Sequence, residues 1–206
     1  MKALDYKVIH SGSTGNAVRI ENIMFDCGVP YKDMKEELYK CKFLFITHKH
    51  TDHLKISTFK KIKTNHRNIK VIANYDVASK IHVDFILGDD PVPIKTKTFE
   101  LQAFPVVHDV VTHGATITFK DKKVIYVTDS AGTDTWLEGK YDYLFIESNH
   151  DETIINNVKK SQYGYDVLSA AKRHTSKQQS KAFYYLNRKS PDSEWIELHQ
   201  SGRFYK

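Results

Sequence analysis

Three histidines and one aspartate fall within a single short segment, and their side chains could bind metal ions. These residues are His48, His50, Asp52 and His53. The apolar run 43–46 before them predicts a buried strand, and a helix-like stretch, 55–62, follows. Neutral imidazole and carboxylate are usual zinc ligands, at about 2.0–2.2 Å. A solvated histidine-rich loop is the alternative interpretation, but the acid inside the cluster and the preceding strand end favour a metal site.

The spacing His-x-His-x-Asp-His resembles the signature of the metallo-β-lactamase superfamily, and the resemblance extends along most of the chain. It implies three further ligands, each at the end of a strand. The chain offers His108 after the run 104–107, Asp129 after 124–128 and His199 after 195–198. A sheet holds its strand ends rigidly, as the ligands of a metal site require.

The same resemblance implies two zinc ions, with manganese as an alternative metal, and a specific distribution of ligands. One ion would be bound by His48, His50 and His108, the second by Asp52, His53 and His199, and Asp129 would bridge the two. Asp52 would also orient the attacking water, whose pKa falls from about 15.7 to roughly 7 when a metal binds it.

Asp26, in the segment Phe25-Asp26-Cys27-Gly28, matches an acid near the start of the family pattern. It would accept a hydrogen bond that orients a ligand histidine, without being a ligand itself. A turn at a strand end, with a glycine close behind, is an equally good interpretation of this segment.

Two C-terminal segments resemble elements of the tRNA 3′-end endonucleases of this superfamily. The segment 199–204, His-Gln-Ser-Gly-Arg-Phe, resembles their C-terminal motif, and Arg173-His174-Thr175-Ser176 resembles their Gly-His-Ser-Thr element, with arginine for glycine and the hydroxyl residues reversed. The resemblance implies that His174 is a catalytic histidine that assists the leaving phosphate oxygen. Two alternatives stay open: His174 is a surface histidine beside a basic helix, or His174 is a metal ligand in place of His199.

A second resemblance is to compact bacterial DNA exonucleases of the same fold. It rests on the loop Ser11-Gly12-Ser13-Thr14-Gly15-Asn16 and on the segment 147–151, Glu-Ser-Asn-His-Asp. Small residues in such a loop let backbone N–H groups approach an anionic ligand, although an ordinary hairpin turn has the same composition. His150 would face the metals or the substrate, or would cap a loop.

The chain has 206 residues, which suits one domain, 1–206, and we expect the α/β class with the four-layer αββα metallo-β-lactamase sandwich that the resemblance implies. Short apolar runs alternate with helical patterns, and the segment 89–93 is interpreted as a connection rather than a domain boundary. The expected strands are 7–9, 17–20, 23–25, 43–46, 71–73, 99–104, 115–119, 124–128, 143–146 and 194–198. The expected helices are 32–39, 55–62, 77–81, 165–172 and 177–186.

The net charge of +6 favours an anionic substrate, and basic residues cluster at 60–63, at Lys159 and Lys160, and at Lys172 and Arg173. A solvated helix face is the alternative for any one of these lysines. The two cysteines form no Cys-x-x-Cys pair, so we expect reduced thiols. Mean hydropathy is −0.51, and no long apolar run suggests a leader or a membrane span, so we expect a cytoplasmic protein.

These observations favour a dinuclear-zinc phosphodiesterase that acts on DNA or RNA. No segment is long enough for the arm with which the tRNA 3′-end endonucleases grip tRNA, so tRNA processing is disfavoured. The alternatives are a phosphodiesterase for small or cyclic nucleotides, completed by a homodimer partner, and a non-catalytic binding module braced by metal. A lactamase or thioesterase is a weaker further alternative.

Overall fold

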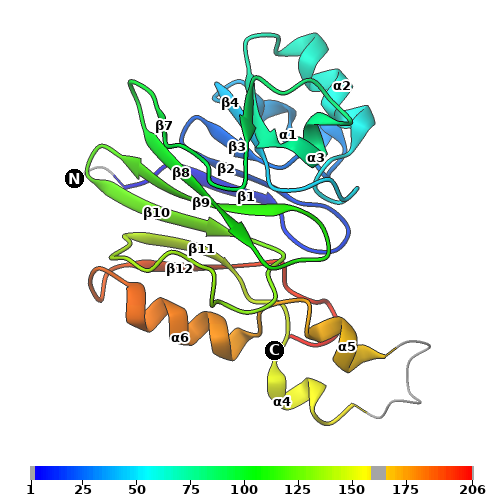
Figure 1. The fold of residues 1–206 in the computed structure, drawn as a ribbon, viewed down its shortest axis with the longest axis vertical. Coiled ribbons are helices and arrows are strands. Elements are labelled where there is room, and N and C mark those ends of the chain that lie inside the picture. Colours follow the sequence, from blue (N-terminus) through cyan, green and yellow to red (C-terminus); the bar gives the residue numbers. More distant parts are fainter. Residues whose placement is uncertain (1–2, 159–165, 206) are drawn as a thin grey trace. The chain divides into compact units, whose positions relative to one another are not determined.

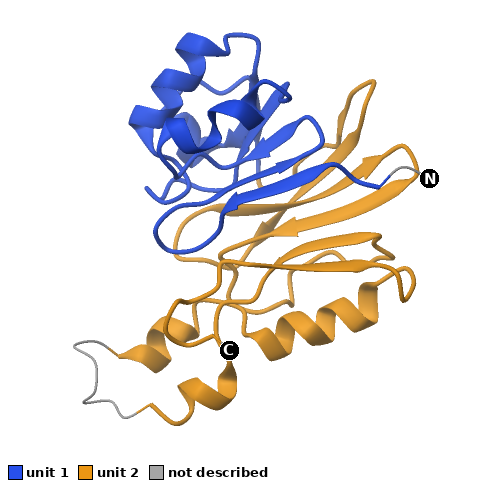
Figure 2. Cartoon of the chain, turned by 180° about the vertical axis from the view of Figure 1, so that it is seen from behind, with its two compact units in different colours: residues 1–88 blue, residues 89–206 orange. Residues whose placement is uncertain are grey.

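The computed structural model describes residues 3–158 and 166–205; Lys159, Lys160 and Tyr165, which the sequence analysis placed in a basic cluster and a helix, lie outside the described residues. The chain forms two compact units, residues 1–88 and 89–206 (Figure 2). Each unit contains a mixed six-stranded sheet with helices (Figure 1). The α/β class and the two sheets are therefore confirmed, and the division falls just before the predicted connection at 89–93.

Unit 1 has the strand order β1-β2-β3-β4-β5-β6. The first three strands are antiparallel neighbours, and β3 to β6 run parallel. The strands are β1 (Tyr6–His10), β2 (Ala17–Ile20), β3 (Ile23–Phe25), β4 (Phe43–Ile46), β5 (Lys70–Asn74) and β6 (Phe85–Leu87). Parallel neighbours need crossover connections, and these contain α1 (Tyr31–Leu38), α2 (Ile56–Asn65) and α3 (Tyr75–Ala78).

The core of unit 1 lies between its helices and one face of its sheet. Met34 and Leu38, four residues apart on α1, are buried in the same cluster as Leu44 and Ile46 of β4. The intervening Phe45 is also fully buried. Both faces of β4 are therefore covered, which explains why its sequence is continuously apolar rather than alternating.

Unit 2 has the strand order β12-β11-β10-β9-β8-β7. Strands β10, β11 and β12 are parallel, whereas β7 to β10 are antiparallel neighbours. The strands are β7 (Ile94–Lys95), β8 (Glu100–Val106), β9 (Thr112–Phe119), β10 (Lys122–Val127), β11 (Tyr143–Glu147) and β12 (Glu194–Leu198). Because β8 and β10 are both antiparallel to β9, their carboxyl ends lie at the same edge of the sheet as those of β11 and β12.

The helices of unit 2 are α4 (Glu152–Ile155), α5 (Val167–Ala171) and α6 (Lys177–Asn187). A capping box between Ser176 and Gln179 begins α6. Phe183 and Tyr184 of α6 then pack in a cluster that contains alternate residues of β10 and β11. A smaller cluster joins α4 and α5 through Ile155 and Val167.

The expected strands and helices are present, with ends displaced by a few residues. The short elements β6, β7 and α4 were not predicted, because elements of two to four residues are too short to show a periodic pattern in the sequence. Both cysteines are buried and free, as expected, and burial raises the pKa of Cys27 and raises that of Cys41 to about 12. In the described ranges, no helix is long and apolar enough to cross a membrane.

Candidate metal and catalytic site

The predicted site residues of unit 1 lie at the carboxyl ends of its parallel strands. Asp26 follows β3, and the loop Thr47–His53 follows β4, which pairs with β3 in parallel register. Asn74, at the end of β5, donates a hydrogen bond from Nδ2 to the carbonyl oxygen of Thr47 at 3.2 Å. Three neighbouring strands thus hold the histidine-rich loop from one edge of the sheet.

Asp26 is fully buried and receives hydrogen bonds from two sides. His53 Nδ1 donates to Oδ2 at 2.8 Å, and the backbone N–H of Thr47 donates to Oδ1 at 2.8 Å. The hydroxyl of Thr47 donates to the same carboxylate, at 3.0 Å, and lies 3.0 Å from His48 Nδ1. The hydrogen bond expected between Asp26 and a histidine of the loop is therefore present. Since Nδ1 of His48 and of His53 both point into this network, Nε2 is the nitrogen of each ring that can bind a metal.

The donor atoms of the histidine-rich loop have separations within about 0.2 Å of those that zinc requires. His48 Nε2 lies 3.1 Å from His50 Nδ1, and His53 Nε2 lies 3.6 Å from Asp52 Oδ2. Two ligands on a tetrahedral ion, each at about 2.0–2.2 Å, are separated by roughly 3.3–3.6 Å. The residues present therefore fit the metal that the fold implies.

The loop 11–16 positions one further side chain beside this cluster. Asn16 Nδ2 donates to His53 Nε2 at 2.8 Å, the nitrogen predicted to bind metal, so an ion at that nitrogen would replace this hydrogen bond. The N–H groups of Gly12 and Gly15 bond within the loop, and that of Asn16 donates to the carbonyl oxygen of Asp52. These three N–H groups thus hold the loop in place instead of pointing at a ligand.

Gly28 lets two backbone segments touch at the histidine-rich loop. A Cβ atom on this residue would lie 1.7 Å from the carbonyl oxygen of Asp52 and 2.9 Å from the amide nitrogen of Asn16. No side chain fits in that space. The sequence analysis noted this glycine only as a turn residue.

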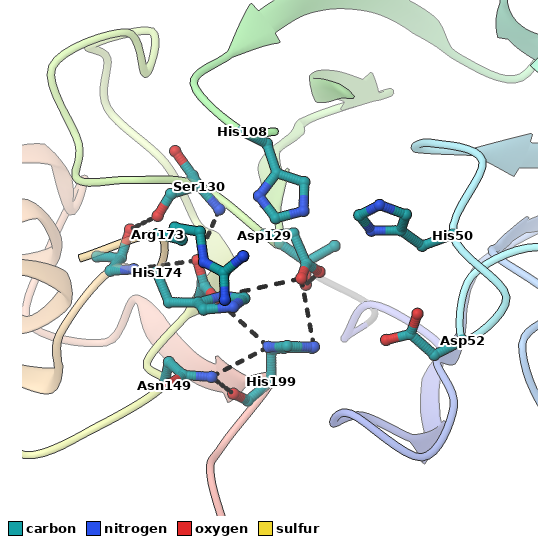
Figure 3. A network of polar contacts seen from close by, with 12 residues as sticks. His50, Asp52, His108, Asp129, Ser130, Asn149, Arg173, His174 and His199 are labelled. Carbon is teal, nitrogen blue, oxygen red and sulfur yellow. Dashed lines mark hydrogen bonds and ion pairs between the residues drawn. The ribbon is translucent and has the colours of Figure 1, made fainter. Parts of the chain in front are cut away.

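The predicted site residues of unit 2 also follow strand ends. Asp129 and His199 come after the parallel strands β10 and β12, and His199 Nε2 lies 3.4 Å from Asp129 Oδ1 (Figure 3). Asn149, after β11, donates from Nδ2 to the carbonyl oxygen of His199 at 2.8 Å. The separation of 3.4 Å between His199 Nε2 and Asp129 Oδ1 lies between the two separations found in unit 1, 3.1 and 3.6 Å.

A buried carboxylate that the sequence analysis had not assigned lies behind these ligands. Glu147 Oε2 accepts hydrogen bonds from the backbone N–H groups of Ser130, at 2.7 Å, and of Thr175, at 3.2 Å. Glu147 Oε1 accepts from His174 Nδ1 at 2.7 Å and lies 3.3 Å from His199 Nδ1. Glu147 therefore positions both histidines. The signal was present, because Glu147 also ends an apolar strand.

His174 follows α5 and is four-fifths buried on its side chain, with its ring stacked on that of His199 at 5.1 Å. Burial opposes its protonation, but the hydrogen bond and charge of Glu147, together with the charge of Asp129, outweigh burial and raise the pKa of His174. One atom from each of Asp129, Glu147, His174 and His199 lies within 4.8 Å of the others. His199 is the better candidate ligand of the two, because its Nε2 lies 3.4 Å from Asp129 Oδ1. The His174 atom that lies 3.8 Å from Asp129 Oδ1 is Nδ1, which is already bonded to Glu147.

His108 and His150 occupy separate positions in unit 2. His108 follows β8, its side chain is buried, and its Nε2 lies 3.1 Å from Asp109 Oδ1. Its ring centroid is 5.8 Å from that of His174. His150 is buried beside the start of α6, where its backbone carbonyl accepts a hydrogen bond from Lys177. The ligand sets that combine His108, His199 or Asp129 with residues of unit 1 stay predictions.

Three of these residues adopt the left-handed backbone conformation. The φ angles are 61° at Asp26, 53° at Asp129 and 53° at His199. Such angles are uncommon outside glycine and cluster at functional sites, where the surrounding structure offsets the strain. Each of the three turns the chain abruptly at a strand end and carries a side chain that the sequence analysis had selected.

Comparison with known proteins identifies the family. The model described as the beta-lactamase superfamily domain matches residues 21–155, well over half of the chain. The comparison with curated proteins gave no match.

Several solved structures share the fold at low sequence identity. The metallo-beta-lactamase fold protein YhfI from Bacillus subtilis has a TM-score of 0.73 at 16% identity, over 96% of this chain and 86% of that one. Human tRNase Z, short form, has a TM-score of 0.64 at 16% identity, over 96% and 93% of the two chains. A diphosphatase from the PhnP family has a TM-score of 0.64 at 16% identity, over 95% and 86%. The predicted metallo-β-lactamase fold is therefore confirmed.

Proposed function

This chain belongs to the β-lactamase superfamily, and we propose that it is a zinc-dependent phosphodiesterase that cleaves nucleic acid. The observation that carries the proposal is the network around Asp26, in which one buried carboxylate orients His53 directly and His48 through the hydroxyl of Thr47, so that Nε2 is the nitrogen of each ring that faces away from the network. A loop that only needed solvation would not require a buried acid to orient two of its histidines. Similarity to a tRNase Z and to a diphosphatase supports a phosphate ester as the substrate.

The proposed ligands are those expected from the sequence. They are His48, His50 and His108 for one ion, Asp52, His53 and His199 for the other, and Asp129 for both. When bound, two zinc ions would supply an activated water and neutralise the charge that builds on the phosphate oxygens.

The protein side chains would control the protons of the reaction. The carboxylate of Asp52, a quarter exposed, would orient the attacking water. His174 has Nδ1 bonded to Glu147, so Nε2 is the ring nitrogen that would donate a proton to the leaving oxygen. The raised pKa of His174 favours the protonated form that a general acid needs.

An assay with added zinc or manganese tests the proposal. The substrates are bis-p-nitrophenyl phosphate, linear DNA, RNA and cyclic mononucleotides, with a chelator control. We expect cleavage of DNA or RNA, which His50→Ala and Asp129→Ala each abolish. His82→Ala, at an exposed histidine, serves as the matched control.

The other outcomes would assign a different function. Turnover of cyclic mononucleotides alone would replace the nuclease with a small-nucleotide phosphodiesterase. A single tightly bound ion per chain, with no hydrolysis, would indicate a binding module braced by metal, because structural zinc sites are usually closed and four-coordinate.

A further inference from the structure

A cavity of about 330 Å³ lies within unit 2, beside the candidate catalytic histidine. This volume is in the range of small-molecule sites, roughly 300–1,000 Å³. One wall comes from α4 and α5, and another from His150 and the start of α6. His174 lines the cavity too, so it is shared with the candidate catalytic site. Protonation of the leaving oxygen by His174, as proposed above, assigns no ligand to this cavity.

His150 lines this cavity and carries a buried polar atom without a partner among the described residues. The residue is 7% exposed, and its Nδ1 has no hydrogen-bond partner among the residues that the structure describes. Its backbone is held by a bridge to Ser176 and by the N–H of Lys177, which donates to the carbonyl oxygen of His150 at 2.8 Å. Burial lowers the pKa of His150, so its ring is neutral near pH 7. A neutral imidazole offers one donor and one acceptor.

The remaining lining suits an uncharged, flat ligand better than an anion. Ile155, Leu168 and Ala171 supply apolar surface. Glu152 lines the cavity and accepts a hydrogen bond from the hydroxyl of Ser176 at 2.5 Å, and Asp134 adds a second carboxyl group. Apart from His174, the lining carries these two acids and one basic side chain, Lys172, so it does not favour a phosphate inside the cavity. A heteroaromatic ring, with apolar faces and polar edges, matches this combination of groups.

We propose that this cavity binds the nucleobase of the nucleotide next to the scissile phosphate, and that His150 recognises the edge of the base. The inference rests on the proposed phosphodiesterase function and specifies its substrate as a nucleotide whose base enters the protein. Because His174 lines the same cavity, a base held there would place its phosphate near the group proposed to protonate the leaving oxygen. An unstacked, single-stranded nucleotide meets this requirement, whereas a base inside a duplex must first be extruded.

Binding of uncharged nucleosides tests the inference without hydrolysis. The full chain, free of added metal, is titrated with adenosine, guanosine, cytidine and uridine while the side-chain NMR signals of its histidines are followed. Ribose 5-phosphate, which has no base, is the ligand control. We expect at least one nucleoside to shift the His150 signals at millimolar or lower concentration, and ribose 5-phosphate to leave them unchanged.

Two variants locate the binding site. His150→Ala should weaken nucleoside binding about tenfold or more, because two hydrogen bonds are lost. Leu168→Trp should block binding by filling the cavity, whereas Ser169→Trp, at an exposed position on the same helix, should bind nucleosides like the wild type.

Three outcomes would overturn the inference: no nucleoside binds, binding is unaffected by both His150→Ala and Leu168→Trp, or ribose 5-phosphate binds as tightly as the nucleosides. Hydrolysis of bis-p-nitrophenyl phosphate by a protein that binds no nucleoside would leave the proposed function standing and remove only this inference. Nucleoside binding at His150 without any phosphodiester hydrolysis would support the base site and contradict the proposed function.

Discussion

Replacing Asp26 by asparagine should weaken zinc binding while the fold is retained. Asp26 accepts from Thr47 N–H through Oδ1 and from His53 Nδ1 through Oδ2, each at 2.8 Å. An asparagine must keep its oxygen toward the Thr47 N–H, so its NH₂ group faces His53 Nδ1. The proton of His53 then moves to Nε2 in the favoured tautomer, and the ring no longer offers that nitrogen to a metal.

The size of the loss in zinc affinity follows from the hydrogen bond between residue 26 and His53 Nδ1, which the variant must give up when Nε2 of His53 binds zinc. A hydrogen bond to a charged group contributes about 1.5–3 kcal/mol, and a factor of ten in affinity corresponds to about 1.4 kcal/mol. Zinc affinity should therefore fall about ten- to a hundredfold, which is the usual loss when the partner of a ligand histidine is removed. The hydroxyl of Thr47 can accept from the new amide, so the unfolding temperature should change by only about 5 °C or less.

Competition with a chromophoric zinc chelator gives the affinity and the number of ions bound. Nitrogen chemical shifts of His53 report its tautomer directly, and Asp33→Asn, at an exposed acid in the first turn of α1, is the matched control. Wild-type zinc affinity in Asp26→Asn would show that the buried carboxylate does not set the tautomer, and the reasoning from this network would be wrong.

The remaining predictions concern stability and reactivity. Burial raises the pKa of the Glu37 carboxyl, but Arg19 more than offsets this and holds it below its ordinary value. This contribution to stability is therefore complete above the unfolded pKa of about 4.3 and is lost as the pH falls through the lower folded value. In urea titrations between about pH 5 and 3, Glu37→Gln should flatten the pH dependence, and Glu36→Gln, at an exposed neighbour, should leave it unchanged. The two buried cysteines, whose pKa values are raised by burial, should not react with a thiol reagent until denaturant unfolds the chain; rapid labelling of the native protein would contradict their burial. Gly28→Ala should lower the free energy of unfolding by about 1–3 kcal/mol or more, because its Cβ meets the carbonyl oxygen of Asp52 at 1.7 Å; unchanged urea unfolding would count against this close packing.

The sequence by itself determined the elements and the ligands that are local in the chain. His48, His50, Asp52 and His53 share one loop, so their spacing is enough to suggest a metal site, and the apolar run before them is enough to predict β4. The positions of Asp129 and His199 at strand ends were predictable for a similar reason, since Asp129 follows the β-branched run 124–128 and His199 follows the mostly apolar segment 195–198.

Only the tertiary structure decided which polar groups hold these ligands in place. Glu147 meets His199 and the backbone of Ser130 because β10, β11 and β12 run parallel and bring their ends to one edge. The contact of Asn16 with His53 and the close approach at Gly28 likewise join segments distant in the sequence. Hydrogen bonds of this kind depend on strand pairing and on the direction of individual atoms, and neither is encoded in the spacing of residues along the chain.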